Sequence, residues 1–155
     1  MLEVTAENIL INLEVDSKEE VLRILVDLLV KNGYLTKGYY DVVAEREEKY
    51  PTGLPTEGIK VAIPHGFSED SVLKPAVGIA TLARPVIFKN MFADDEELAV
   101  EMVFLLALTN KDEQGKDLAR IMDVFSDSSL LLRLHAAKTG HELTELVKSS
   151  LSEEE

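Results

Sequence analysis

Two apolar segments near the middle of the chain place the strongest constraint on its fold. Residues 76–82 read AVGIATL and residues 100–108 read VEMVFLLAL. Runs of this length and composition are typical of strands that are buried on both faces, and such strands need covering layers on both sides of their sheet. The acidic segment 93–97, ADDEE, is expected to separate these two strands.

Helical patterns flank the two strands along the chain. Residues 8–15 are predicted to form a further strand, and Ser17 and Glu20 then have the spacing of a capping box for a helix. That helix is expected to end at Asn32 and Gly33. Further helices are predicted over residues 36–49 with a cap at Thr36, from about 111 to 125, over 128–136 and over 139–148, followed by a solvated tail. This alternation predicts an α/β fold, a single-domain sandwich over residues 1–155 with a mixed β-sheet flanked by helices.

The charge of the chain argues against one class of partner. Lys and Arg number 16 against 29 Asp and Glu, a formal net charge of -13. No nucleic-acid partner is expected, because nucleic-acid binding depends on clustered Lys and Arg, whereas an acidic surface favours a basic protein partner. The longest apolar block, residues 102–108, is too short to cross a bilayer. We therefore expect a cytoplasmic protein without direct membrane insertion.

Several common chemistries lack their motifs. The sequence contains no GxxxxGK[ST] loop, no GxGxxG turn, no HExxH or GxSxG motif, and no cysteine. His135 and His141 are six residues apart, a spacing that does not place them on one helix face, and we interpret them as helix-surface histidines. No metal, nucleotide or other cofactor is expected.

The segment 61–66, VAIPHG, is the leading candidate for chemistry. Pro64 has a fixed φ and biases Ile63 to an extended conformation, while Gly66 removes side-chain bulk just beyond the imidazole. Such a turn would hold His65 at the end of a strand with room for an anion beside it. A neutral ring nitrogen is a nucleophile near pH 7. From these residues alone, a nucleophilic His65 and a buried histidine with a structural role both stay open.

Arg46 is the candidate cation for an anion bound at His65. It lies in AEREEKYPTG, at the end of the second predicted helix and before the loop that returns to His65. The planar guanidinium suits phosphate better than a lysine does. The alternative is a solvated network between Arg46 and the neighbouring glutamates at helical spacing.

The order of these pieces resembles a known family. The stretch REEKYPTGLPTEGIKVAIPHG is similar to the active-site region of the enzyme IIA domains of the sugar phosphotransferase system (PTS), in the mannitol/fructose superfamily. The segments TGLPTEGIKVAIPH, KPAVGIATLARPVIFKNM and ADDEELAVEMVFLLAL resemble its galactitol-type branch. The resemblance covers most of the chain, and its separated pieces match in order.

The resemblance implies that residues 1–155 form one PTS enzyme IIA type-2 domain with phosphotransferase activity. Such domains accept a phosphoryl group from the phosphohistidine of HPr and pass it to a cysteine of a cognate IIB protein. Through IIB they serve a membrane IIC permease that takes up a sugar or sugar alcohol, here suggested to be galactitol. The alternative is a regulatory IIA-like protein that binds another protein according to its phosphorylation state.

The resemblance also implies roles for four residues. The phosphorylated histidine of the family falls on His65, and its arginine before the PTG loop falls on Arg46. Its acidic residue before the active-site strand falls on Glu57, in a stretch longer than the mannitol-type spacing. Many relatives carry a second histidine at the start of the helix after the long strand, where this chain has Gln114. Glutamine can donate a hydrogen bond to a phosphoryl oxygen but cannot titrate.

Overall fold

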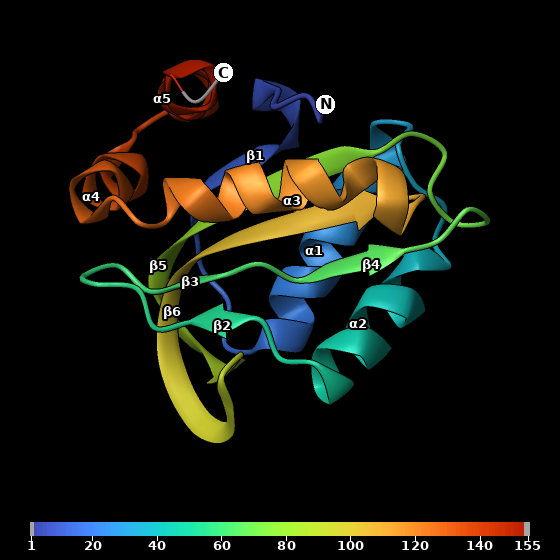
Figure 1. Ribbon diagram of the computed structural model, residues 1–155, viewed down its shortest axis with the longest axis horizontal. Coiled ribbons are helices and arrows are strands. Elements are labelled where there is room, and N and C mark those ends of the chain that lie inside the picture. The colour runs from blue at the N-terminus through green and yellow to red at the C-terminus, as the bar shows by residue number, and fades with distance from the viewer. Residues whose placement is uncertain (1, 154–155) are drawn as a thin grey trace.

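The molecule has three layers, with a six-stranded mixed sheet between two layers of helices (Figure 1). The computed structural model describes residues 2–153, apart from the side chains of residues 111–113 and 152–153. None of the described helices is long and apolar enough to span a bilayer. One face of the sheet carries α1 (Lys18–Lys31) and α2 (Tyr39–Lys49), and the other carries α3 (Lys111–Val124), α4 (Ser128–Ala136) and α5 (Gly140–Glu153). The predicted α/β sandwich is confirmed.

A long antiparallel hairpin forms the centre of the sheet. Its strands are β5 (Ala76–Asn90) and β6 (Ala93–Leu108), which contain the two apolar segments of the sequence. The remaining strands are short and pair with this hairpin. Strand β1 (Ile9–Leu13) follows the 3-10 helix Ala6–Asn8 and runs parallel to β5, while β3 (Val61–Ala62) and β4 (His65–Phe67) run parallel to β6, and β2 (Gly53–Leu54) joins β3 to β5.

The acidic segment 93–97 does not separate the two strands, as the sequence suggested, but forms the beginning of β6. The hairpin extends beyond the apolar segments as a two-stranded arm, drawn at the bottom of Figure 1. Phe88, Leu98 and Val100 are buried in this arm, whereas Asp94 and its acidic neighbours are exposed. Antiparallel strands tolerate such charges because one side of the ribbon faces water.

Two apolar cores lie on opposite faces of the sheet. On the face of α1, Leu22, Leu25 and Leu29 recur at helical spacing and are buried in one cluster with Leu105 of β6. On the other face, the ring of Phe104 in β6 packs edge-on against Phe125, with 4.9 Å between ring centroids. Neighbouring side chains of β6 therefore pack alternately into the two cores, which explains why this part of its sequence is continuously apolar.

The first helix begins with the predicted capping box. The Ser17 hydroxyl accepts a hydrogen bond from the Glu20 backbone N–H at 3.2 Å, and the Glu20 carboxylate accepts one from the Asp16 N–H at 3.3 Å. The first bond satisfies one of the amide groups that a helix start leaves unpaired, and the second ties the residue before the cap to the first turn. At the other end, Gly33 has a φ of 86°, the left-handed conformation expected of a residue that ends a helix.

Two other helix boundaries differ from the sequence-based prediction. Thr36 does not cap α2, which begins after Gly38 with no side-chain cap. The Thr36 N–H instead donates to the Ser71 carbonyl at 2.9 Å, so the residue belongs to a contact between two loops. Helix α5 continues to Glu153, so part of the predicted solvated tail is helical, and residues 154–155 lie outside the described residues.

Gly53 lies at a close approach between two strands. It pairs with Ala62 in β3 and with Asn90 in β5. A Cβ atom added at Gly53 would lie 2.6 Å from the carbonyl oxygen of Lys89, which belongs to the backbone and cannot rotate away. Only a residue without a side chain fits there.

We therefore expect Gly53→Ala to lower the free energy of unfolding by about 1–3 kcal/mol, the usual cost of overpacking. Gly115→Ala is the matched control, because a Cβ there meets nothing within 4 Å and the residue lies inside α3. That substitution should raise stability by up to about 1 kcal/mol. Urea denaturation of the two variants measures both changes. Equal stabilities of Gly53→Ala and the wild type would contradict the close approach.

Candidate active site

His65 begins a strand instead of ending one, as the sequence suggested. Proline interrupts the extended chain, so that β3 ends before Ile63 and Pro64, and His65 opens β4. Both short strands still pair with β6, and the Pro64 carbonyl accepts a hydrogen bond from the Leu106 N–H at 2.9 Å. The missing N–H of proline removes one donor at this point. The pairing on either side fixes the backbone of His65 against the central strand.

The imidazole of His65 is held in one protonation pattern. Its Nδ1 lies 2.8 Å from the Ile63 carbonyl oxygen, which can only accept, so we assign the proton to Nδ1 and the lone pair to Nε2. Burial lowers the pKa of His65, and Arg46 adds to this effect, whereas the bond to Ile63 opposes it. The ring is therefore neutral at pH 7, with Nε2 as its nucleophilic atom.

Gly66 provides space for packing beneath the histidine, not for an anion as the sequence suggested. A Cβ at Gly66 would lie 3.0 Å from Val42 Cγ1 and 3.2 Å from the Tyr39 hydroxyl oxygen. That hydroxyl is 2.7 Å from the Leu106 carbonyl and 3.2 Å from the Gly66 carbonyl. Burial raises the pKa of Tyr39, so it stays a neutral donor. Tyr39 thereby ties α2 to β4 and β6.

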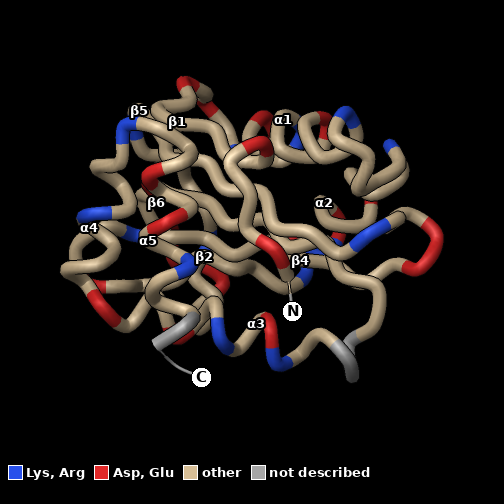
Figure 2. Tube along the Cα trace, turned by 90° about the horizontal axis from the view of Figure 1, so that it is seen from above, with Lys and Arg blue, Asp and Glu red and all other residues tan. Residues whose placement is uncertain are grey.

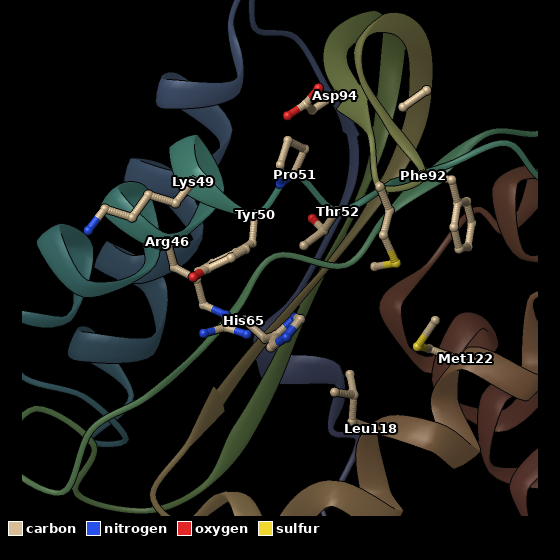
Figure 3. Close-up of a pocket in the computed structure, with 12 residues that line it drawn as sticks. Arg46, Lys49, Tyr50, Pro51, Thr52, His65, Phe92, Asp94, Leu118 and Met122 are labelled. Carbon is tan, nitrogen blue, oxygen red and sulfur yellow. The ribbon is translucent and has the colours of Figure 1, made fainter.

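Arg46 extends from α2 toward His65 (Figure 3). Its guanidinium carbon lies 5.3 Å from the ring centroid of Tyr50 and 5.6 Å from that of Phe67. Within the described residues, its buried Nε has no hydrogen-bond partner and no carboxylate pairs with it, so the solvated network with neighbouring glutamates is not formed. Unfilled guanidinium donors beside a neutral histidine suit a bound anion.

Glu47 is a buried residue of the site that the sequence analysis missed. It is 3% exposed, and its carboxylate accepts hydrogen bonds from Thr52, at 2.9 Å from the backbone N–H and 2.7 Å from the hydroxyl. Burial raises its pKa to about 7, although the bonds to Thr52 oppose the rise. The one available signal was its position four residues after Val43 and eight after Tyr39, on the buried face of α2.

A pocket of about 720 Å³ lies beside His65 (Figure 3). Arg46 and Lys49 bring positive charge to it from α2, while the hairpin arm and α3 supply mainly apolar side chains. Two of its aromatic residues are largely exposed, Tyr50 at 62% and Phe92 at 73%. The pocket thus combines a neutral imidazole, cations and an exposed apolar rim. Its other lining residues are Pro51, Thr52, Met91, Ala93, Asp94, Leu118 and Met122.

The other two predicted site residues do not line this pocket. Glu57 is exposed in the loop between β2 and β3. Gln114 is buried, and its side-chain oxygen accepts hydrogen bonds from the backbone N–H groups of Thr109 at 2.7 Å and Asn110 at 3.3 Å. Its amide nitrogen donates to the Thr109 hydroxyl at 3.0 Å. Gln114 therefore binds the start of α3 to the end of β6, and phosphoryl contacts by Gln114 and Glu57 stay predictions.

Acidic residues are spread around the molecule and interspersed with Lys and Arg (Figure 2). The net charge of -13 is therefore not concentrated on one face. In the part of the chain that the structure describes, no three His, Asp or Glu residues form a group that could hold a metal ion. His135 is half-buried, with Nε2 at 3.3 Å from the Leu82 carbonyl, and His141 is exposed.

Comparison with known proteins identifies the family. The family described as "Phosphoenolpyruvate-dependent sugar phosphotransferase system, EIIA 2" matches residues 4–150. The chain belongs to the PTS EIIA 2 family. EIIA components are phosphotransferases that relay phosphoryl groups through a histidine, so the predicted enzyme class is confirmed.

Named relatives of this EIIA 2 protein include free-standing and fused components. The ascorbate-specific PTS system EIIA component of Salmonella paratyphi A is 30% identical over 92% of this chain and 91% of its own length. The mannitol-specific EIICBA component of Escherichia coli is 31% identical over 92% of this chain but 21% of its own length. A solved complex of Escherichia coli enzyme IIA for mannitol with phosphorylated IIB is 28% identical, covers 96% of this chain and 99% of the other, and has a TM-score of 0.78.

Nuclear magnetic resonance of the His65 ring nitrogens tests the protonation pattern. We expect long-range correlations typical of the Nδ1–H tautomer, because the Ile63 carbonyl can only accept. The titration midpoint should fall below the ordinary value of 6.5, because burial disfavours the charged ring. A midpoint above that value, or a ring protonated mainly at Nε2, would contradict the assignment.

Glu47→Gln should flatten the pH dependence of stability. The carboxyl pKa is about 7 in the folded protein against 4.5 as the reference value, so unfolding releases a proton between these values and stability falls as pH rises through them. The free energy of unfolding of the wild type, measured relative to Glu47→Gln by urea denaturation, should fall by about 2 kcal/mol from pH 5 to pH 8. The titration of His65 is common to both proteins and cancels. A difference that does not change with pH would contradict the buried acid.

Proposed function

We propose that the protein is a phosphocarrier of the sugar phosphotransferase system in which Nε2 of His65 accepts a phosphoryl group from HPr. It then passes the group to a cysteine of a cognate IIB protein, which serves a membrane IIC permease. The single observation that carries this proposal is the neutral imidazole, with Nδ1 bound to the Ile63 carbonyl at 2.8 Å, beside an Arg46 guanidinium whose Nε has no hydrogen-bond partner among the described residues. The relay runs in the cytoplasm.

In each of the two transfer steps, one bond to phosphorus forms while another breaks. The Nε2 lone pair attacks phosphorus while the phosphorus–nitrogen bond of the donor breaks and the donor imidazole recovers its electron pair. In the second step a cysteine thiolate attacks phosphorus, and Nε2 of His65 recovers its lone pair. The bond between Nδ1 and Ile63 keeps the ring oriented throughout, and it stabilises the positive charge that the ring gains when Nε2 is substituted.

Arg46 supplies charge stabilisation. Phosphoryl transfer spreads negative charge over three oxygens, and it depends mainly on alignment and electrostatic stabilisation. The guanidinium lies near the rings of Tyr50 and Phe67, and its Nε lacks a partner among the described residues. It can therefore bind phosphoryl oxygens without first giving up an ion pair.

The exposed rim of the pocket is the proposed contact surface for the protein partners. A donor or acceptor side chain must approach Nε2 directly, so the partner surface must meet the residues that surround the pocket. Tyr50 and Phe92 present apolar surface there, and Lys49 presents a charge. The IIA–IIB complex for mannitol and the fused mannitol-specific EIICBA component support a IIB partner and a IIC permease for this chain.

The proposed cargo is a sugar or sugar alcohol. Galactitol, which the sequence resemblance suggests, stays a prediction, because the relatives named above are described as ascorbate-specific and mannitol-specific. Their names support a small polyhydroxylated carbon source as the cargo. Specificity within that class belongs to the membrane partner.

The test is phosphorylation of the purified protein by phosphoenolpyruvate, enzyme I and HPr. The wild type should gain one acid-labile phosphoryl group by mass, and His65→Ala should gain none. Arg46→Ala should slow labelling by about 100-fold, as expected for loss of a charged donor in the transition state, with Arg46→Lys between the two. Labelling that persists in His65→Ala would contradict the proposal. Labelling of His65 without transfer to any IIB protein would favour the regulatory alternative.

A further inference from the structure

We propose that Glu47 is a positioning residue that sets the relative placement of Arg46 and His65 through a relay of hydrogen bonds. The inference rests on the proposed phosphocarrier function for its kinetic consequence, but the relay itself belongs to the structure. Glu47 follows Arg46 directly in α2, and it is buried while Arg46 extends toward the pocket. One turn of helix therefore provides both the phosphoryl-binding cation and the buried anchor.

The relay begins at the loop after α2. The Glu47 carboxylate accepts hydrogen bonds from both the backbone N–H and the hydroxyl of Thr52. The Thr52 carbonyl in turn accepts from the Ile63 N–H at 3.2 Å. The Ile63 carbonyl then accepts from Nδ1 of His65 at 2.8 Å. Three consecutive connections thus join the helix that carries Arg46 to the nitrogen that fixes the imidazole.

Thr52 has a second part in this arrangement because it also lines the pocket. It is 2% exposed and immediately precedes β2, whose Gly53 pairs with Ala62 of β3. Movement of Thr52 would therefore shift both the wall of the pocket and the strand that leads to His65. The two bonds from Glu47 restrain Thr52 at its backbone and at its side chain together.

Burial of a carboxylate at this position has a cost that packing alone does not explain. An isolated ionised group in the protein interior is strongly disfavoured, and the raised pKa of Glu47 reflects that cost. Glu47 shares the buried face of α2 with Tyr39 and Val43, where an apolar residue would be less costly. An apolar side chain, however, could not accept two hydrogen bonds from Thr52. The anchoring of Thr52 therefore accounts for a buried acid at this position.

The experiment compares Glu47→Ala with Glu47→Gln. The amide oxygen of glutamine can accept from the Thr52 N–H and its nitrogen can donate to the Thr52 hydroxyl, so both connections survive. Glu47→Ala should lower kcat for phosphoryl transfer by at least about 10-fold, since a misplaced reacting group costs alignment. Its KM for HPr should change little, because Glu47 is buried and outside the exposed rim. Glu47→Gln should stay within about 2-fold of the wild type in both constants.

Two further variants guard against a trivial result. Glu45→Ala is the matched control, because Glu45 is an exposed acid that directly precedes Arg46 in the sequence. This substitution should leave kcat unchanged. Thr52→Val keeps the backbone bond to Glu47 and removes the hydroxyl bond, so it should give an intermediate loss and remains informative if Glu47→Ala fails to fold. Circular dichroism confirms that the compared variants are folded.

A spectroscopic arm tests the relay without phosphotransfer. In folded Glu47→Ala, or in Thr52→Val if that protein is needed, the ring nitrogens of His65 should show a smaller population of the Nδ1–H tautomer than in the wild type. An unchanged tautomer population, an unchanged kcat, or equal losses in Glu47→Gln and Glu47→Ala would overturn the inference. Failure of the wild type to accept a phosphoryl group from HPr would count against the proposed function alone. The spectroscopic arm would still decide the role of Glu47.

Discussion

The hydrogen bond between Nδ1 of His65 and the Ile63 carbonyl is the contact on which the chemistry of the site depends. At 2.8 Å it determines which ring nitrogen carries the proton and which one keeps a free lone pair. The bond exists because Pro64 separates two short strands, so that the carbonyl of Ile63 lies within reach of the ring of His65. Burial keeps the same ring neutral. Orientation and nucleophilicity therefore share one local cause.

The rest of the fold holds that contact in place. Strands β3 and β4 together contain only five residues and could not form a stable sheet alone. Both pair with the long strand β6. Tyr39 binds β4 and β6 to α2 from beneath, and the same helix carries Arg46 at its other end. Arg46 and His65 thus reach the pocket from one helix and from the short edge strand β4, which pairs with β6.

Much of this arrangement could be predicted from sequence. The apolar segments in β5 and β6 and the capping box at Ser17 depend on local patterns. The placement of Arg46 near His65 was expected because Arg46 precedes the loop that returns to His65. Glu47 was missed because its neighbours Glu45 and Glu48 make the segment resemble a solvated helix face, and because the Thr52 groups that bind its carboxylate come from the loop after the helix. The acidic segment 93–97 was wrongly expected to separate the two strands. Its charged side chains face water, so its composition resembles that of a loop although it begins β6. Gly66 was expected to leave room for an anion, because Val42 and Tyr39, which pack against it, are distant from it in the sequence.

The most direct measurement of the central claim is the position of the phosphoryl group on the phosphorylated protein. Nitrogen and phosphorus NMR of a ¹⁵N-histidine sample distinguishes the two ring nitrogens of His65. Because Nδ1 donates to the Ile63 carbonyl, we expect phosphorus bonded to Nε2, with Nδ1 still protonated. Phosphorus bonded to Nδ1, or to any residue other than His65, would contradict it.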